Sequence, residues 1–176
     1  SQIQEKMSRR KSLLDDVESD LEGKLTSVLK EQELRRGVGP FKFLWPPVDF
    51  RFARLPKLLI ISPRNRIHLE ETKFLYSNIT SEETNRLEDK LLEEEDLSAL
   101  VGNISGLATY PAIIQNSDLL IDVLITAAHE WLHQYWFFHS LGQAYFSSAE
   151  MTTLNETAAD IAGRELGNLV FNQMNV

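Results

Sequence analysis

The chain has 176 residues, of which 43% are hydrophobic and 9% are aromatic, and it contains no cysteine. This length suits one domain with its own core, and the composition excludes a disordered chain. The absence of cysteine excludes a disulfide framework and a thiolate metal site. Any metal ion must therefore be bound by His, Asp and Glu, which suits zinc and harder divalent ions.

Charge is unevenly distributed along the chain. Residues 1–66 carry 14 basic and 9 acidic side chains, whereas residues 67–176 carry 4 basic and 17 acidic ones. The acidic C-terminal part argues against nucleic acid as a partner. The longest apolar run, residues 118–138, is interrupted by Asp122 and by His129-Glu130, so no stretch here spans a bilayer. Membrane association would have to come from segments outside this sequence, and no residue pattern fixes a compartment.

Residues 3–36 predict one long, highly charged helix, which forms the first of two predicted parts, 1–36 and 37–176. A narrow apolar stripe runs along this helix at helical spacing. Its members are Leu14, Val17, Leu21, Leu25 and Val28. Such a stripe packs either on the domain or on a partner helix, and we expect the domain.

The remaining elements alternate between strands and helices. Short strands are predicted at 48–52, 57–62 and within 98–114, where Gly106 and Pro111 interrupt the pattern, and residues 67–76 predict a further strand or a hairpin. Helices are predicted from Ser81 to residue 95, from about 118 to 139 with Asn116 or Ser117 as N-cap, and from about Ser148 to Phe171. The order predicts an α+β domain with a small mixed sheet and a buried central helix.

The central helix carries HEWLH, residues 129–133. On a helix, residues four apart lie within about 40° of each other, so His129 and His133 can bind one metal ion. Glu130 lies on the neighbouring flank, where it can reach a water molecule without binding the metal itself. This spacing therefore predicts two ligands and a general base.

A catalytic zinc site needs a third protein ligand, and two candidates follow in the sequence. His139 has the spacing of the metzincin pattern, but Trp136 stands where that pattern requires a glycine. On a continuous helix His139 would be about 80° off the ligand face and more than two turns along the axis. Glu156 in NETAAD is the better candidate, because Asp160 lies one turn further on and can accept a hydrogen bond from a ligand histidine.

Together, HEWLH and NETAAD resemble the gluzincin metallopeptidases, the thermolysin-like group, over residues 118–166. The resemblance implies a zincin-like fold and one zinc ion held by His129, His133 and Glu156. It also implies that Glu130 is the catalytic base and that Asp160 supports a ligand histidine.

These residues predict zinc-dependent hydrolysis of peptide bonds in a peptide or protein substrate. The alternatives are a metzincin-type site that uses His139 and a non-enzymatic domain that binds metal or a partner. Hydrolysis also needs a hydrogen-bond donor at the developing oxyanion, for which Tyr145 is the first candidate, followed by Tyr110 and His68. A strand within 98–114 is a candidate edge for pairing with an extended peptide.

Overall fold

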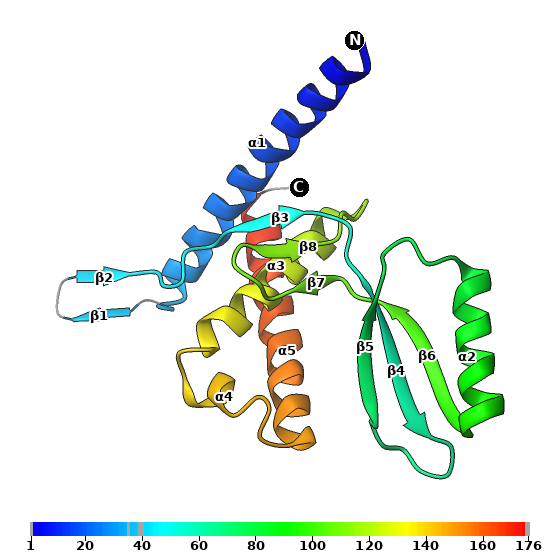
Figure 1. Ribbon diagram of the computed structural model, residues 1–176. Helices are drawn as coiled ribbons and strands as arrows, with labels where there is room; N and C mark the ends of the chain where they lie inside the picture. The colour runs from blue at the N-terminus through cyan, green and yellow to red at the C-terminus, as the bar shows by residue number, and fades with distance from the viewer. Residues whose placement is uncertain (1, 35, 39–40, 175–176) are drawn as a thin grey trace. The chain divides into compact units, whose positions relative to one another are not determined.

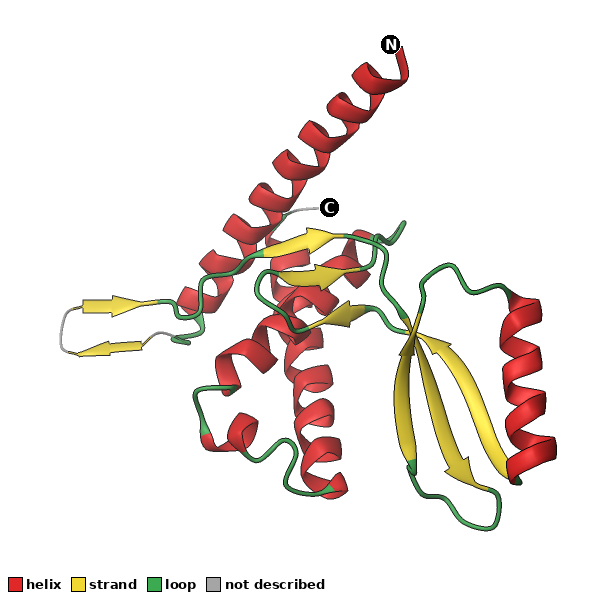
Figure 2. Ribbon diagram, in the orientation of Figure 1, coloured by secondary structure: helices red, strands yellow, loops and turns green. Residues whose placement is uncertain are grey.

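The computed structural model describes residues 2–34, 36–38 and 41–174 (Figure 1). The chain forms two compact units: unit 1 comprises Ser1–Ala53 and Gly106–Val176, and unit 2 comprises Arg54–Ser105. Unit 2 is thus inserted between two segments of unit 1. Both units mix helices with short strands (Figure 2), which confirms the predicted α+β class. Among the described residues, no helix is both long enough and apolar enough to cross a membrane.

Unit 1 is built around the apolar helix α3. Its helices are α1 (Gln2–Glu31), α3 (Leu120–Trp136), α4 (Ser140–Gln143) and α5 (Ala149–Gln173). Its strands are β1 (Arg36–Val38), β2 (Phe41–Phe43), β3 (Phe50–Phe52), β7 (Gly106–Leu107) and β8 (Ala112–Ile114). The core gathers side chains from α1, the sheet, α3 and α5, including Leu25, Ile114, Leu124, Trp131 and Val170. The indole of Trp131 also donates a hydrogen bond of 2.9 Å to the Pro46 carbonyl.

Small residues bring α5 unusually close to α3. Ala159, Gly163 and Gly167 recur every four residues on the buried face of α5. A Cβ atom at Gly163 would lie 3.0 Å from the backbone nitrogen of His129, and one at Gly167 would lie 2.8 Å from Cα of Ile125. The absence of side chains at these two glycines therefore permits the close crossing of the two helices. The crossing in turn fixes the position of the N-terminal part of α5 relative to α3.

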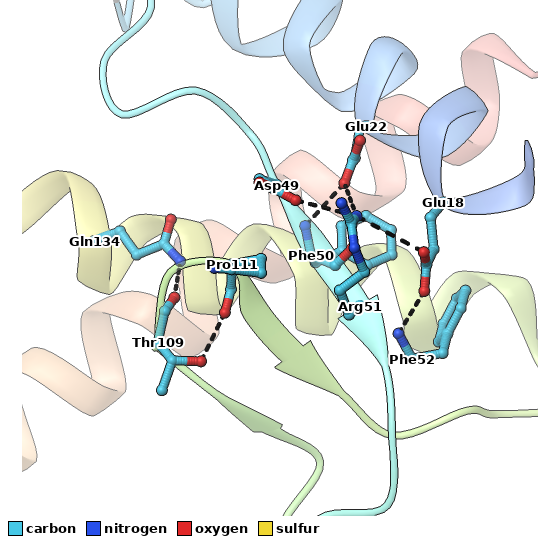
Figure 3. Close-up of polar contacts among 9 residues, drawn as sticks. All are labelled: Glu18, Glu22, Asp49, Phe50, Arg51, Phe52, Thr109, Pro111 and Gln134. Atoms are coloured by element: carbon cyan, nitrogen blue, oxygen red, sulfur yellow. Dashed lines mark hydrogen bonds and ion pairs between the residues drawn. The ribbon is translucent and has the colours of Figure 1, made fainter. Parts of the chain in front are cut away.

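The three-stranded sheet of unit 1 is mixed, with the order β3-β8-β7. Strands β3 and β8 are parallel, with Phe50 opposite Ala112, while β7 and β8 are antiparallel. The outer side of β3 is occupied by α1: Glu22 accepts a hydrogen bond of 2.9 Å from the Phe50 nitrogen, and Glu18 accepts one of 2.6 Å from the Phe52 nitrogen (Figure 3). This leaves β7 as the edge of the sheet that no described strand or helix carboxylate caps.

Unit 2 is an antiparallel sheet with one helix. It contains β4 (Lys57–Pro63), β5 (Glu71–Leu75), α2 (Ser81–Glu95) and β6 (Leu97–Asn103), with the strand order β5-β4-β6. Helix α2 starts as predicted, with a capping box in which Thr80 and Glu83 satisfy each other's backbone nitrogens. Glu88 on α2 accepts a hydrogen bond of 2.7 Å from the Val101 nitrogen on β6.

Three predicted helix boundaries were wrong. Helix α1 ends at Glu31 rather than residue 36, because Glu33 turns the chain with a φ of 58° and Arg36–Val38 pairs as a strand with β2. Helix α3 ends at Trp136 rather than residue 139, where α4 folds back with Gly142 against the Trp136 carbonyl. Its N-cap is Leu119, which makes no side-chain cap. Ser117 instead accepts a hydrogen bond from the Leu119 nitrogen before the helix begins.

The glycine contacts predict opposite stability effects for two helical substitutions. Gly167→Ala should lower the free energy of unfolding by about 1–3 kcal/mol, because the new methyl group meets the backbone of α3. Gly23→Ala on α1 should raise it by about 0.5–1 kcal/mol, because no atom lies within 4 Å of the added Cβ. Urea denaturation followed by circular dichroism measures both. Equal effects of the two substitutions would contradict the close crossing of α3 and α5.

Candidate metal centre

Helix α3 places two imidazoles on one face, as the sequence predicted. His129 and His133 are one turn apart, both partly buried, and their Nε2 atoms lie 2.9 Å apart. The helix around them is largely apolar, and neighbours on either side of His129, including Ala128 and Trp131, are buried. The two ring nitrogens therefore converge at a site bordered by a dry helix surface.

Helix α5 adds a carboxylate to these imidazoles. Oε2 of Glu156 lies 3.4 Å from Nε2 of His129 and 3.4 Å from Nε2 of His133. His129, His133 and Glu156 thus form a group that can hold a metal ion, because their ligand atoms all lie within 4.8 Å of one another. Four-coordinate zinc with bonds of about 2.0–2.1 Å separates its ligand atoms by roughly 3.3–3.4 Å. The two distances from Glu156 fit that geometry, and the histidine nitrogens, 2.9 Å apart, would have to separate slightly around an ion.

Asp160 fixes which nitrogen of His129 faces the group. Its Oδ1 lies 3.0 Å from Nδ1 of His129, and a carboxylate at that position requires a proton on Nδ1. A neutral His129 then presents the lone pair of Nε2 toward Glu156. Lone pairs gathered this closely repel one another unless a cation lies among them. Positive charge, either as protons on the imidazoles or as a metal ion, is therefore needed to stabilise these nitrogen and carboxylate oxygen atoms at such short distances.

The pKa shifts of the group have the same origin. Burial alone would lower the pKa of His129, but the neighbouring carboxylates, Glu156 first among them, outweigh burial and raise it. The two imidazoles hold the pKa of Glu156 well below its usual range, because both can donate to that carboxylate. Glu156 thus remains an anion, which is the form that binds a metal.

Glu130 is the most buried carboxylate near the group, with 6% of its surface exposed. Burial raises its pKa to about 7, although the positive charge on His129 and His133 acts in the opposite direction. Its side chain lies against β7, where a Cβ atom at Gly106 would be 2.1 Å from Oε1 of Glu130. Glu130 is therefore held between the histidine helix and the sheet edge and is not one of the three grouped ligands.

Tyr145, in the segment between α4 and α5, also reaches the group. Its hydroxyl donates a hydrogen bond to Oε1 of Glu156, and its ring lies 6.0 Å from that of His133. Burial, together with this hydrogen bond, raises the pKa of Tyr145, so the hydroxyl keeps its proton. In the structure Tyr145 thus holds one oxygen of Glu156 while the other oxygen faces the histidines.

Three other candidates lie elsewhere. His139 is not part of the group: its Nδ1 lies 2.9 Å from the Tyr135 carbonyl, and its ring packs against the Tyr135 ring at 4.5 Å. Tyr110 lies exposed between β7 and β8, and His68 belongs to unit 2, whereas the group lies in unit 1. Of the described residues, the group therefore takes its third member from Glu156 rather than from His139.

Sequence reasoning missed several residues that position the group. Asn155 is buried next to Glu156 and donates a hydrogen bond of 3.1 Å to the Leu141 carbonyl, which ties the start of α5 to α4. Gln134, which follows His133, donates to the Thr109 carbonyl in the turn between β7 and β8 (Figure 3). Of these residues, only Asn155 belongs to the NETAAD motif, so only Asn155 could have been singled out from the sequence. The partner of Gln134 is 25 residues away, and nothing local predicts it.

Comparison with known proteins gives no further guide to this group. No protein-family model, no curated protein and no solved structure matches the chain. The geometry of the group is therefore the basis for inferring its function.

The two candidate third ligands predict opposite results on substitution. Glu156→Ala should lose most of the bound zinc, because it removes the carboxylate facing both histidines. His139→Ala should retain zinc, because that ring packs on Tyr135 instead. Metal content after dialysis measures both, with circular dichroism to show that each variant is folded. An empty His139→Ala protein beside a loaded Glu156→Ala protein would favour the metzincin alternative.

Asp160→Asn should weaken zinc affinity by roughly 10–100-fold, the usual effect of removing a carboxylate that orients a ligand histidine. The neutral amide neither fixes the ring tautomer as strongly nor raises the basicity of His129 as much. Competition with a chelator measures the affinity. Asp118→Asn, an exposed change outside the group, is the matched control. Equal affinities for the two variants would show that Asp160 does not support the ligand.

Proposed function

We propose that this protein is a zinc-dependent metallopeptidase of the gluzincin type. In this proposal His129, His133 and Glu156 hold one zinc ion, and Glu130 is the general base. The observation that carries the proposal is the position of Glu130, a buried carboxylate beside a group of three side chains that can hold a metal ion and against the face of the edge strand β7. Metal storage or a purely structural metal site would not require a buried carboxylate there.

A bound zinc ion would supply Lewis acidity, lowering the pKa of a water molecule to about 7 and polarising the substrate carbonyl. Glu130 would accept one proton from the attacking water as the water oxygen bonds to the carbonyl carbon. When the carbon–nitrogen bond breaks, the carboxylic acid of Glu130 gives the same proton to the leaving amine nitrogen. Without a metal ion, burial raises the pKa of Glu130 to about 7, and a bound cation would lower it, which favours the carboxylate form that accepts the proton.

The sheet edges support an extended peptide as the substrate. An added strand needs unpaired backbone groups, and Glu18 and Glu22 already occupy the backbone nitrogens on the outer side of β3 (Figure 3). Strand β7 is the opposite edge, and it lies against Glu130. A peptide paired with β7 would bring its backbone carbonyls next to the base. Binding through the backbone also implies tolerance of many side chains.

The geometry around Tyr145 supports a positioning role more directly than a role at the oxyanion. Its hydroxyl is engaged with Glu156, where it directs one carboxylate oxygen toward the histidines. A hydroxyl that keeps its proton can also donate to a developing oxyanion if it leaves that partner. The oxyanion role therefore stays a prediction, and comparing zinc affinity with kcat in Tyr145→Phe separates the two roles.

Glu130→Gln should retain zinc and lower peptide hydrolysis by at least about 100-fold, because the amide cannot accept the proton of the water. Cleavage of a mixed peptide library, read by mass spectrometry, measures activity. Glu165→Gln is the matched control, since it makes the same chemical change at an exposed position of α5. A Glu130→Gln protein that hydrolyses peptides normally would refute the assigned role. A wild-type protein that binds zinc but cleaves no peptide would favour the non-enzymatic metal-binding alternative.

A further inference from the structure

Helix α1 has an apolar stripe that Arg10 interrupts, and unit 1 covers only the C-terminal half of the stripe. Leu21 and Leu25 are 3% and 0% exposed, whereas Ile3, Met7 and Val17 are 71%, 66% and 47% exposed. The prediction that the stripe packs on the domain was therefore correct for only part of the helix. The N-terminal half, residues 2–17, presents the same stripe to solvent.

The spacing of the exposed stripe is that of a coiled coil. Its positions alternate between steps of four and three residues, which is the heptad pattern. In order they are Ile3, Met7, Arg10, Leu14 and Val17, and the next position of the pattern is the buried Leu21. The stripe is narrow, and basic or acidic side chains flank it on both sides. A helix lying on a lipid surface needs a broader apolar face, so a second helix is the better match.

We propose that residues 7–17 of α1 pair with the same residues of a second copy of this chain, in antiparallel orientation, as a short two-helix coiled coil. Charge is segregated along this part of the helix in a way that makes it self-complementary. Residues 6–11 contain four basic and no acidic side chains, and residues 15–20 contain four acidic and no basic ones. Antiparallel pairing brings each basic stretch opposite the acidic stretch of the other copy.

The heptad positions decide between the two orientations. In a parallel, in-register pair, Arg10 would face Arg10 of the other copy in the seam, and Lys6 would face Lys11 on the flank. In an antiparallel pair centred on residue 12, Arg10 instead meets Leu14, Met7 meets Val17, and Lys6 faces Asp20.

Two flanking pairs lie on the two-fold axis of the antiparallel arrangement. Leu13, which is exposed in the single chain, would meet its own copy and gain apolar contact. Lys11 would also meet its own copy, with Asp15 four residues further along the same helix to offset the like charge. The parallel pair has like-charge contacts at Arg10 and at Lys6. In the antiparallel pair Arg10 instead contacts an apolar side chain and Lys6 contacts an acidic one.

Sedimentation of the full chain over a range of concentrations tests the pairing. The apparent mass should rise from 20.2 kDa toward twice that value as the concentration is raised. Met7→Asp, which puts a charge in the seam, should weaken association at least about tenfold. Ser8→Asp, the neighbouring exposed position on the opposite face, should change it less than about twofold. A chain that stays monomeric up to about 1 mM, or variants that behave alike, would overturn the proposal.

Disulfide trapping tests the orientation, and the absence of native cysteine makes it clean. Met7→Cys mixed with Val17→Cys should give the mixed disulfide on oxidation, while each variant alone should stay largely uncross-linked. Homodisulfides from either variant alone would overturn the antiparallel arrangement. Co-sedimentation of the monomer with phosphatidylserine vesicles, lost in Met7→Asp but not in Ser8→Asp, would show instead that the stripe binds a membrane surface.

Discussion

The close crossing of α3 and α5 is the constraint on which the rest of unit 1 depends. A methyl group at Gly167 would lie 2.8 Å from the Ile125 backbone and has no room, while one at Gly163 would lie 3.0 Å from the His129 backbone and would fit only if its neighbours shifted. The same helix carries Glu156 less than two turns before Gly163. Displacing α5 would therefore move Glu156 relative to His129 and His133, so the packing of the core and the geometry of the candidate metal centre depend on each other.

The pKa values of two glutamates in the candidate centre shift in opposite directions, and this distinguishes them more clearly than their spacing in the sequence does. Oε2 of Glu156 lies 3.4 Å from Nε2 of both histidines, and its pKa is held far below its usual range, so it is suited to bind a cation. Glu130 is buried and has a pKa raised to about 7, so it is suited to exchange a proton. When the environment shifts the pKa values of two neighbouring carboxylates in opposite directions, one can exchange protons while the other stays ionised and stabilises positive charge. A bound cation would lower the pKa of Glu130 in turn, which favours its basic form.

The sequence predicted those features that depend on local geometry. Residues four apart share a helix face, so helical spacing alone pairs His129 with His133 and Glu156 with Asp160. Helix ends at Glu31 and Trp136 were missed because strand β1 and the fold-back of α4 end those helices, and both are tertiary events. The sequence did not predict that unit 2 is inserted into unit 1, because no change of composition marks the limits of unit 2 at Arg54 and Ser105. Gly106 was interpreted as a strand interruption and Gly163 and Gly167 carried no prediction, whereas all three are points of close approach.

A recurring device links the fold to the proposed substrate. In unit 1, Glu18 and Glu22 of α1 accept hydrogen bonds from β3, and in unit 2, Glu88 of α2 accepts one from β6. Exposed strand edges invite pairing with other chains, and a helix carboxylate blocks that pairing without adding a strand. Glu18 and Glu22 look like ordinary solvated charges in the sequence, yet they close one edge of the unit 1 sheet. The edge they leave uncapped is β7, which lies against Glu130. Closing β3 thus confines strand addition in this sheet to the side where the candidate base and metal ligands lie.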